Sequence, residues 1–202
     1  MTIGVLALQG DFASHTQILQ RCNVDEIIAV RDAAALQRCD GLIIPGGEST
    51  TMSRLCDRYE LWQPLQTAIN SGLPVLGTCA GMIMLSKNIS GATQNFAQKT
   101  LGVLDIDVAR NAYGRQIESF ETDLLIPALQ EIGVSEKPVH VAFIRAPQIT
   151  RVGENVEVLA THDDRAVAVR AGKIMALSFH PEVSGEARLH ELWLSKIKGV
   201  AL

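Results

Sequence analysis

The segment Pro74-Val75-Leu76-Gly77-Thr78-Cys79-Ala80-Gly81 gives the strongest indication of how this chain folds. A short apolar run leads into a Gly-x-Cys-x-Gly motif, and a mainly apolar, helix-compatible stretch follows it. Strand, sharp turn and helix in this order form the nucleophile elbow known from α/β hydrolases. We therefore expect a parallel β-sheet with Cys79 at the carboxyl end of one of its strands.

The first half of the chain repeats the alternation of strand and helix that builds such a sheet. Its apolar runs are rich in Val, Ile and Leu, which is typical of strands covered on both faces. The expected strands are residues 3–8, 25–30, 41–44 and 74–77, and the expected helices are residues 12–22, 50–58, 61–70 and 80–87. We expect one α/β domain over residues 1–202, with a central, mostly parallel sheet.

The second half has strand-like runs joined by turns, which favours antiparallel pairing. The runs are residues 101–108, 116–120, 139–143, 156–160 and 166–170. Ala171-Gly172 is typical of a hairpin turn before a further run, residues 173–177. The last segment is expected to be a helix because Leu189, Leu192, Trp193, Ile197 and Val200 have helical spacing, with Ser184 placed to cap it. Residues 91–99 and 126–137 match no motif, and we expect loops or short helices there.

Composition and charge exclude several classes of function. Hydrophobic residues make up 47% of the chain and charged residues 20%, so a full core can form. The net charge is -4, from 18 basic and 22 acidic residues without a basic cluster, which argues against nucleic-acid or anionic-membrane partners. No apolar stretch approaches the roughly 18 residues of a membrane span.

Cysteine usage and the first residues favour a cytoplasmic location. The opening residues lack a basic leader and fit a first strand, not a secretion signal. Cys22, Cys39, Cys56 and Cys79 never form a C-x-x-C pair, so metal binding and disulfides are both poor interpretations. We therefore expect no metal and no cofactor.

Cys79 is the candidate nucleophile. Flanking glycines at 77 and 81 would let the turn approach its neighbours closely, and a helix N-terminus favours thiolate over thiol. The alternative is a buried structural cysteine, the usual role of a free thiol and our interpretation of the other three.

His180 is the candidate base in Ser178-Phe179-His180-Pro181-Glu182. Side chains two positions apart in an extended backbone point the same way, so Glu182 can fix the imidazole tautomer. The alternatives are a structural histidine and a glutamate that only begins the last helix. The remaining histidines, which are His15, His140, His162 and His190, have no comparable partner in the sequence.

A second loop, Pro45-Gly46-Gly47-Glu48-Ser49-Thr50, follows a strand and opens a helix. Paired glycines let backbone N–H groups face a ligand, so Gly47 and the N–H of Ala80 are candidates for an oxyanion hole. The alternative is an ordinary turn. Neither nucleotide-binding glycine motif is present, which argues against a nucleotide site.

Two arginines, Arg110 and Arg145, are candidates for clamping a substrate carboxylate, because each lies at the end of a strand-like run. The alternative is that both are solvated.

Taken together, these motifs resemble those of the triad, or class I, glutamine amidotransferases. The resemblance spans nearly the whole chain, and within that family it is specific for glutaminase subunits of pyridoxal phosphate synthases. The motifs that carry it are Leu8-Gln9-Gly10, residues 45–52, residues 77–81, Arg110-Asn111 with Gly114-Arg115-Gln116, residues 143–147 and residues 178–182.

The resemblance implies a three-layer, flavodoxin-like fold and a Cys79, His180 and Glu182 triad. It also implies that L-glutamine is bound by Gly46, Gly47, Glu48, Ser49, Arg110, Ile144 and Arg145, and that Gln9 helps to form the oxyanion site. The implied partner is a synthase subunit that receives the ammonia. A free-standing cysteine hydrolase acting on γ-glutamyl substrates is the alternative function that these residues leave open.

Overall fold

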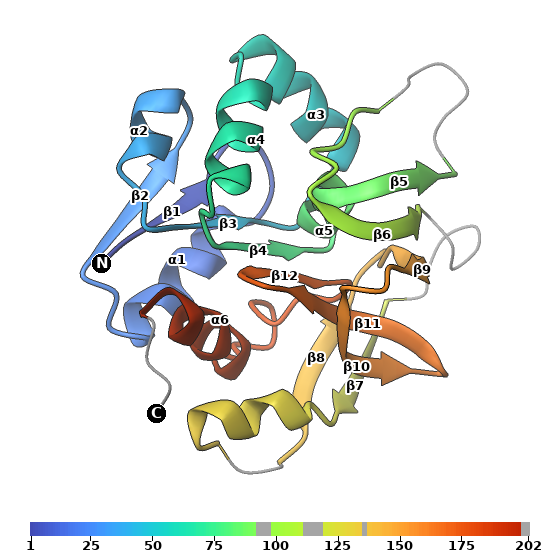
Figure 1. The fold of residues 1–202 in the computed structure, drawn as a ribbon. Helices are drawn as coiled ribbons and strands as arrows, with labels where there is room; N and C mark the ends of the chain where they lie inside the picture. The colour runs from blue at the N-terminus through green and yellow to red at the C-terminus, as the bar shows by residue number, and fades with distance from the viewer. Residues whose placement is uncertain (92–97, 111–118, 135–136, 199–202) are drawn as a thin grey trace.

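A seven-stranded, mostly parallel β-sheet forms the centre of the molecule (Figure 1). The computed structural model describes residues 1–91, 98–110, 119–134 and 137–198. The strands, in spatial order, are β10 (Glu157–His162), β11 (Arg165–Ala171), β12 (Ile174–Leu177), β4 (Val75–Thr78), β3 (Gly41–Ile44), β1 (Thr2–Leu6) and β2 (Glu26–Val30). The five strands from β12 to β2 pair in parallel, whereas β10 and β11 are antiparallel. The expected sheet is therefore confirmed.

Helices cover both faces of this sheet, which gives three layers (Figure 1). On one face lie α2 (Ala33–Gln37), α3 (Ser49–Arg58), α4 (Trp62–Asn70) and α5 (Ala80–Leu85), and on the other lie α1 (Phe12–Arg21) and α6 (Arg188–Lys198). Alternate strand residues enter two separate cores: Leu42 packs with Met52 and Leu65, whereas Ile43 packs with Leu19 and Trp193. Burial on both sides explains why these strands are apolar throughout.

The second half adds smaller sheets at the edge of the molecule. β5 (Ser86–Ser90), β6 (Leu104–Ala109) and β9 (Gln148–Val152) form one sheet. β7 (Phe120–Leu124) and β8 (Val139–Phe143) form an antiparallel pair, and the short 3-10 helix η1 (Pro127–Ile132) lies between them in the chain. The predicted hairpin is present between β11 and β12, with Gly172 at a φ of 56°. The expected antiparallel character of this half is confirmed.

Several predicted boundaries are wrong. The helix expected over residues 80–87 ends at Leu85, because Ser86 begins β5 and its hydroxyl donates to the carbonyl of Ile83. The strand expected over residues 101–108 is shifted to β6. Three elements were not predicted, namely α2, β5 and β9. Most of the strand expected over residues 116–120 lies outside the described residues, and β7 begins at Phe120.

Ser184 does not cap the last helix. Its buried hydroxyl has no hydrogen-bond partner among the described residues, and α6 begins four residues later at Arg188. The Glu186 carboxylate instead accepts from the Arg188 backbone N–H at 2.9 Å. It thus provides a hydrogen-bond partner for one of the free N–H groups at the start of α6. Val200 lies outside the described residues. None of the helices in the described part of the chain has the length and apolarity needed to cross a bilayer.

Candidate active site

Cys79 occupies a strained turn between β4 and α5. Its backbone has φ 47° and ψ -100°, a positive φ that is uncommon for a residue with a side chain. The flanking glycines are required by packing: a Cβ on Gly77 would lie 2.6 Å from Cδ1 of Leu85, and one on Gly81 would overlap the carbonyl oxygen of Ile44. The sequence motif therefore forms the sharp turn that a nucleophile elbow needs.

His180 reaches this turn because its segment leaves a neighbouring strand at the same end of the sheet. Leu177 of β12 is in register with Thr78 of β4, and the Cys79 N–H donates to the Leu177 carbonyl at 2.8 Å. The His180 N–H donates to the carbonyl of Ala142 at 2.8 Å, which fixes its backbone against β8. The His180 side chain lies close enough to the Cys79 side chain for this neighbour to raise the pKa of the imidazole.

Glu182 holds the other side of the imidazole. Its Oε1 lies 2.7 Å from Nδ1 of His180, and its side chain is fully buried. Burial raises the pKa of Glu182, but contacts with His15 and His180 outweigh burial and lower it below its usual range. Burial lowers the pKa of His180, but contacts with Cys79 and Glu182 raise it to about 10. The arrangement therefore favours an imidazolium flanked by two acceptors.

Residues of the loop after β8 lie over the sulfur. The Sγ of Cys79 is 3.8 Å from the carbonyl oxygen of Ile144, whose side chain is partly exposed. The next residue, Arg145, is exposed and has a φ of 49°. The structure thus brings the backbone of Ile144 to the candidate nucleophile, and Arg145 follows it in the chain with an exposed side chain.

The glycine loop lies against the histidine and against Gln9. A Cβ on Gly46 would overlap Cε1 of His180, and a Cβ on Gly47, which has a φ of 154°, would overlap Oε1 of Gln9. That same Oε1 accepts from the Glu48 N–H at 2.7 Å. Gln9 therefore fixes the shape of the loop. Ala80 begins α5, where a backbone N–H has no partner within its own helix.

A cluster of charged and polar side chains begins at the next residues of this loop. Glu48 caps α3 by accepting from the N–H groups of Thr50 and Thr51, and Ser49 begins that helix. Arg110 lies with one guanidinium nitrogen 3.4 Å from Glu48 Oε1 and another 2.6 Å from Oε1 of Gln98. A cation and a carboxylate side by side suit the two charged groups of an α-amino acid.

A model of the SNO glutamine amidotransferase family matches residues 5–199. The chain belongs to this family. The pyridoxal 5'-phosphate synthase subunit PdxT of Kosmotoga olearia is 49% identical over 199 residues, which cover 98% of this chain and 99% of that protein. PdxT of Thermotoga maritima is 48% identical over 198 residues, which cover 98% of this chain and all of that protein. A crystal structure of a glutamine amidotransferase matches with a TM-score of 0.87 at 45% identity, over 98% of this chain and 99% of the other. The expected family and fold are confirmed.

Gln98 contacts two candidate substrate-binding residues, Ser49 and Arg110, and the sequence motifs missed it. It lies in the stretch 91–99, to which no role could be given, and is 8% exposed. Its Oε1 accepts from Arg110 and from the hydroxyl of Ser49 at 3.1 Å, whereas its Nε2 has no partner among the described residues. An isolated glutamine carries no motif, so only the fold could reveal it.

The remaining histidines of this glutamine amidotransferase differ from the sequence expectation in two cases. His15 Nε2 lies 3.5 Å from Glu182 Oε1, so it does contact the candidate site. His140 lies between Asp123 and Glu121, at 2.8 and 3.0 Å, on the exposed surface of β7 and β8. The acidic partners of both histidines are far away in the sequence and are brought close only by the fold, so their spacing could not reveal them.

The other thiols lie in environments unlike that of Cys79. Burial raises the pKa of Cys39 to about 11 and that of Cys56 to about 12, and Cys56 packs in the core between α3 and the sheet. All four cysteines are free. Among the described residues, no group of three or more His, Cys, Asp or Glu side chains is placed to hold a metal ion.

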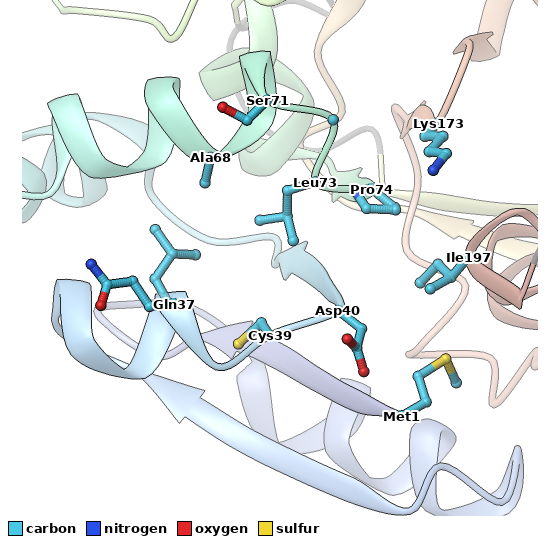
Figure 2. Close-up of a pocket in the computed structure, with 12 residues that line it drawn as sticks. Met1, Gln37, Cys39, Asp40, Ala68, Ser71, Leu73, Pro74, Lys173 and Ile197 are labelled. Carbon is cyan, nitrogen blue, oxygen red and sulfur yellow. The ribbon is translucent and has the colours of Figure 1, made fainter.

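A pocket of about 570 Å³ lies at the opposite end of the sheet of this glutamine amidotransferase (Figure 2). Met1, Asp40, Pro74 and Lys173 line it, and each directly precedes one of the parallel strands. Ligands of open α/β sheets bind at the carboxyl ends of the strands, where Cys79 and His180 lie. The candidate catalytic residues are therefore separate from this pocket.

Proposed function

We propose that this chain is the glutaminase subunit of a pyridoxal 5'-phosphate synthase, in which it hydrolyses L-glutamine and passes the ammonia to a synthase subunit. The observation that carries the proposal is Cys79 at a positive φ beside His180, whose far nitrogen is held by a buried Glu182. Relatives about half identical over nearly the whole chain are named as subunits of that synthase. The protein works as one domain, in the cytoplasm, without a metal or cofactor.

The first half-reaction forms a thioester. The Cys79 thiolate attacks the carboxamide carbon of glutamine, and the electrons of the C=O bond move to oxygen. Backbone N–H groups at Gly47 and Ala80 stabilise that oxyanion. His180, as an imidazolium, donates its proton to the departing nitrogen, so that the C–N bond breaks and ammonia leaves.

The second half-reaction releases glutamate. Neutral His180 takes a proton from water, whose oxygen attacks the thioester carbon. The tetrahedral intermediate collapses with cleavage of the C–S bond, which gives glutamate and restores the thiolate beside the imidazolium. Glu182 stays ionised throughout and stabilises the imidazolium each time it forms.

Substrate recognition uses the polar cluster beside the nucleophile. Arg110 and Arg145 provide cations for the α-carboxylate of glutamine, and Glu48 provides an anion for its α-ammonium group. Ser49, Gly46 and the backbone of Ile144 complete the walls of the site. A substrate that lacks either charged group would leave one of these side chains without its partner and would bind more weakly.

The test is glutamate release, measured with and without the purified synthase subunit of the same organism. Wild type should release glutamate, and nitrogen-15 from the glutamine amide should appear in the synthase product. Cys79→Ala should do neither while still binding the partner, whereas the control Cys39→Ala, at the other end of the sheet, should behave as wild type. Substantial glutamate release by Cys79→Ala would contradict the proposal. Rapid cleavage of γ-glutamyl peptides without any effect of the partner would indicate a free-standing hydrolase instead.

A further inference from the structure

His15 is a second imidazole on the carboxylate of Glu182. It comes from α1, and its Nε2 faces two oxygens: Oγ1 of Thr78 at 3.2 Å and Oε1 of Glu182 at 3.5 Å, the oxygen that also contacts His180. The side chains of His15 and Glu182 are both fully buried. On its other edge, Nδ1 of His15 lies 2.9 Å from Nε2 of His190, a buried residue of α6.

The proton positions follow from the charge of Glu182. A neutral imidazole has one N–H and one lone pair. A lone pair on Nε2 of His15 would face the ionised carboxylate and be repelled, so Nε2 carries a proton, which Oε1 of Glu182 and Oγ1 of Thr78 can accept. On the other edge of the ring, Nδ1 of His15 shares a hydrogen bond with Nε2 of His190.

We propose that His15 is a positioning residue of the triad, whose Nε2–H holds the Glu182 carboxylate in the orientation and charge state that His180 requires. This inference rests on the proposed function. A carboxylate without water around it is costly to ionise unless N–H groups stabilise it. Only Oε1 of Glu182 is contacted by these imidazoles, and Oε2 has no partner among the described residues. Few other N–H groups among the described residues can therefore stabilise the Glu182 carboxylate if His15 is lost.

The electrostatics agree with this geometry. Contact with His15 lowers the pKa of Glu182 against the effect of burial. Burial, foremost, and the nearby His15 lower the pKa of His190 to about 3, so His190 is neutral. The titratable groups whose contacts lower the pKa of Glu182 are His15 and His180, with Cys79 on the far side of His180. Asp11 and Arg21 line a cavity together with Glu182, and His190 lies beyond His15.

A matched pair of amide variants tests the role of the one hydrogen bond. The side-chain amide of His15→Gln reaches the position of Nε2 and can donate to Glu182. The shorter amide of His15→Asn reaches only the position of Nδ1 and His190. Both variants bury one polar amide, so they are comparable in folding. His140→Gln, on the exposed surface of β7 and β8, is the control for histidine loss.

The expected result is a difference between the two amides. His15→Asn should lower kcat for glutaminase activity in the complex by roughly tenfold or more, the effect of one lost charge-assisted hydrogen bond, with KM within about twofold. Its acid limb of kcat/KM should move to higher pH, because Glu182 with one N–H fewer binds a proton more readily. His15→Gln should retain most of the wild-type kcat and the wild-type pH profile.

Equal kcat and equal pH profiles for the two amide variants, whether high or low, would overturn the role of His15. The titration of Glu182, followed by carbon-13 NMR of its carboxyl group, decides the same question without catalysis. The pKa of this carboxyl should be higher in His15→Asn than in His15→Gln, and equal values would also overturn the inference. A wild-type complex that releases no glutamate would overturn the proposed function instead, and the NMR comparison would still decide the role of His15.

Discussion

Gly46 packs directly against the imidazole of His180. A Cβ atom on Gly46 would overlap Cε1 of the ring and would lie 2.9 Å from its Nδ1. The oxyanion loop after β3 and the base after β12 are therefore in contact, although 134 positions separate them in the sequence. The absence of a side chain at this one position sets how close the ring can lie to the loop.

Gly46→Ala should displace His180 and reduce glutaminase activity. A catalytic group misplaced by about 1 Å costs on the order of a hundredfold in rate, and we expect a loss of that size in kcat. Steady-state glutamate release is the measurement. The control is Gly133→Ala at the end of η1, where an added Cβ meets nothing within 4 Å. Its φ of 70° costs about 1 kcal/mol of stability for a residue with a side chain, but this strain lies outside the candidate site. Full activity in Gly46→Ala would show that this contact does not position the base.

Cys79→Ala should lower the pKa of His180. In the wild-type protein, contacts with Cys79 and Glu182 outweigh burial and raise this pKa to about 10. Removal of the sulfur leaves Glu182 as the remaining one of these two partners, so the lowering of the His180 pKa by burial is opposed less strongly. Nitrogen-15 NMR of labelled histidine should show an imidazolium at His180 in wild type at pH 8, and a titration at lower pH in the variant. An unchanged pKa would mean that the thiol and imidazole do not interact as described.

Stability should respond to the same contact at alkaline pH. Because the pKa of His180 is raised on folding, from about 6.5 in an unfolded chain, its contribution to stability is complete below about pH 6.5. It is lost as the pH rises through about 10. Denaturant unfolding should therefore show wild type losing more stability than Cys79→Ala between pH 7 and pH 10.5. A parallel loss in both proteins would contradict this linkage.

Gln98→Ala should weaken glutamine binding more than it slows turnover. Without Oε1 of Gln98, Arg110 loses a 2.6 Å hydrogen bond and Ser49 loses its acceptor. We expect KM for glutamine to rise by about tenfold or more, because hydrogen bonds to charged groups are among the strong ones. Gln66→Ala is the control, since Gln66 lies on α4 and its side chain donates to the carbonyl of Leu101. A change in kcat with KM unaltered would place Gln98 outside substrate binding.

Covalent labelling should distinguish Cys79 from the other cysteines. A glutamine analogue with a chloromethyl ketone in place of the carboxamide would present an electrophilic carbon to the nucleophile. Cys39 and Cys56, whose pKa values are raised to about 11 and 12 by burial, should stay unmodified near neutral pH. Peptide mapping after labelling should find the adduct on Cys79 alone, and glutamine should protect it. Equal labelling of Cys39 would remove the case for a selective nucleophile.

The elbow and the parallel core were predictable because their signals are local. The strand before Cys79 and the glycines around it form one continuous segment, and the strands β2, β3 and β8 fall close to the predicted ranges because their apolar runs are compact. The contact between His180 and Glu182 was also predicted, and it is present at 2.7 Å. Its expected cause, extended backbone through Pro181, is wrong, because Pro181 and Glu182 lie in a turn.

The missed features depend on tertiary pairing. β5 follows α5 without a break and has only Ile89 as a strongly apolar residue, so its pairing with β6 decides its conformation. α2 is five residues long and is fixed at its start by Asp32, whose carboxylate accepts from the Ala35 N–H. The contacts of His15 with Glu182 and of Gln98 with Arg110 join segments that no spacing rule connects.

The central claim is that Cys79 forms a covalent glutamyl intermediate that His180 helps to form and to hydrolyse. The most direct measurement is mass spectrometry of the complex after acid quenching during glutamine turnover. The account predicts one glutamyl group attached as a thioester to the peptide that contains Cys79, lost on treatment with hydroxylamine and absent in Cys79→Ala. Glutamate release at the wild-type rate with no such adduct, or an adduct on another residue, would contradict it.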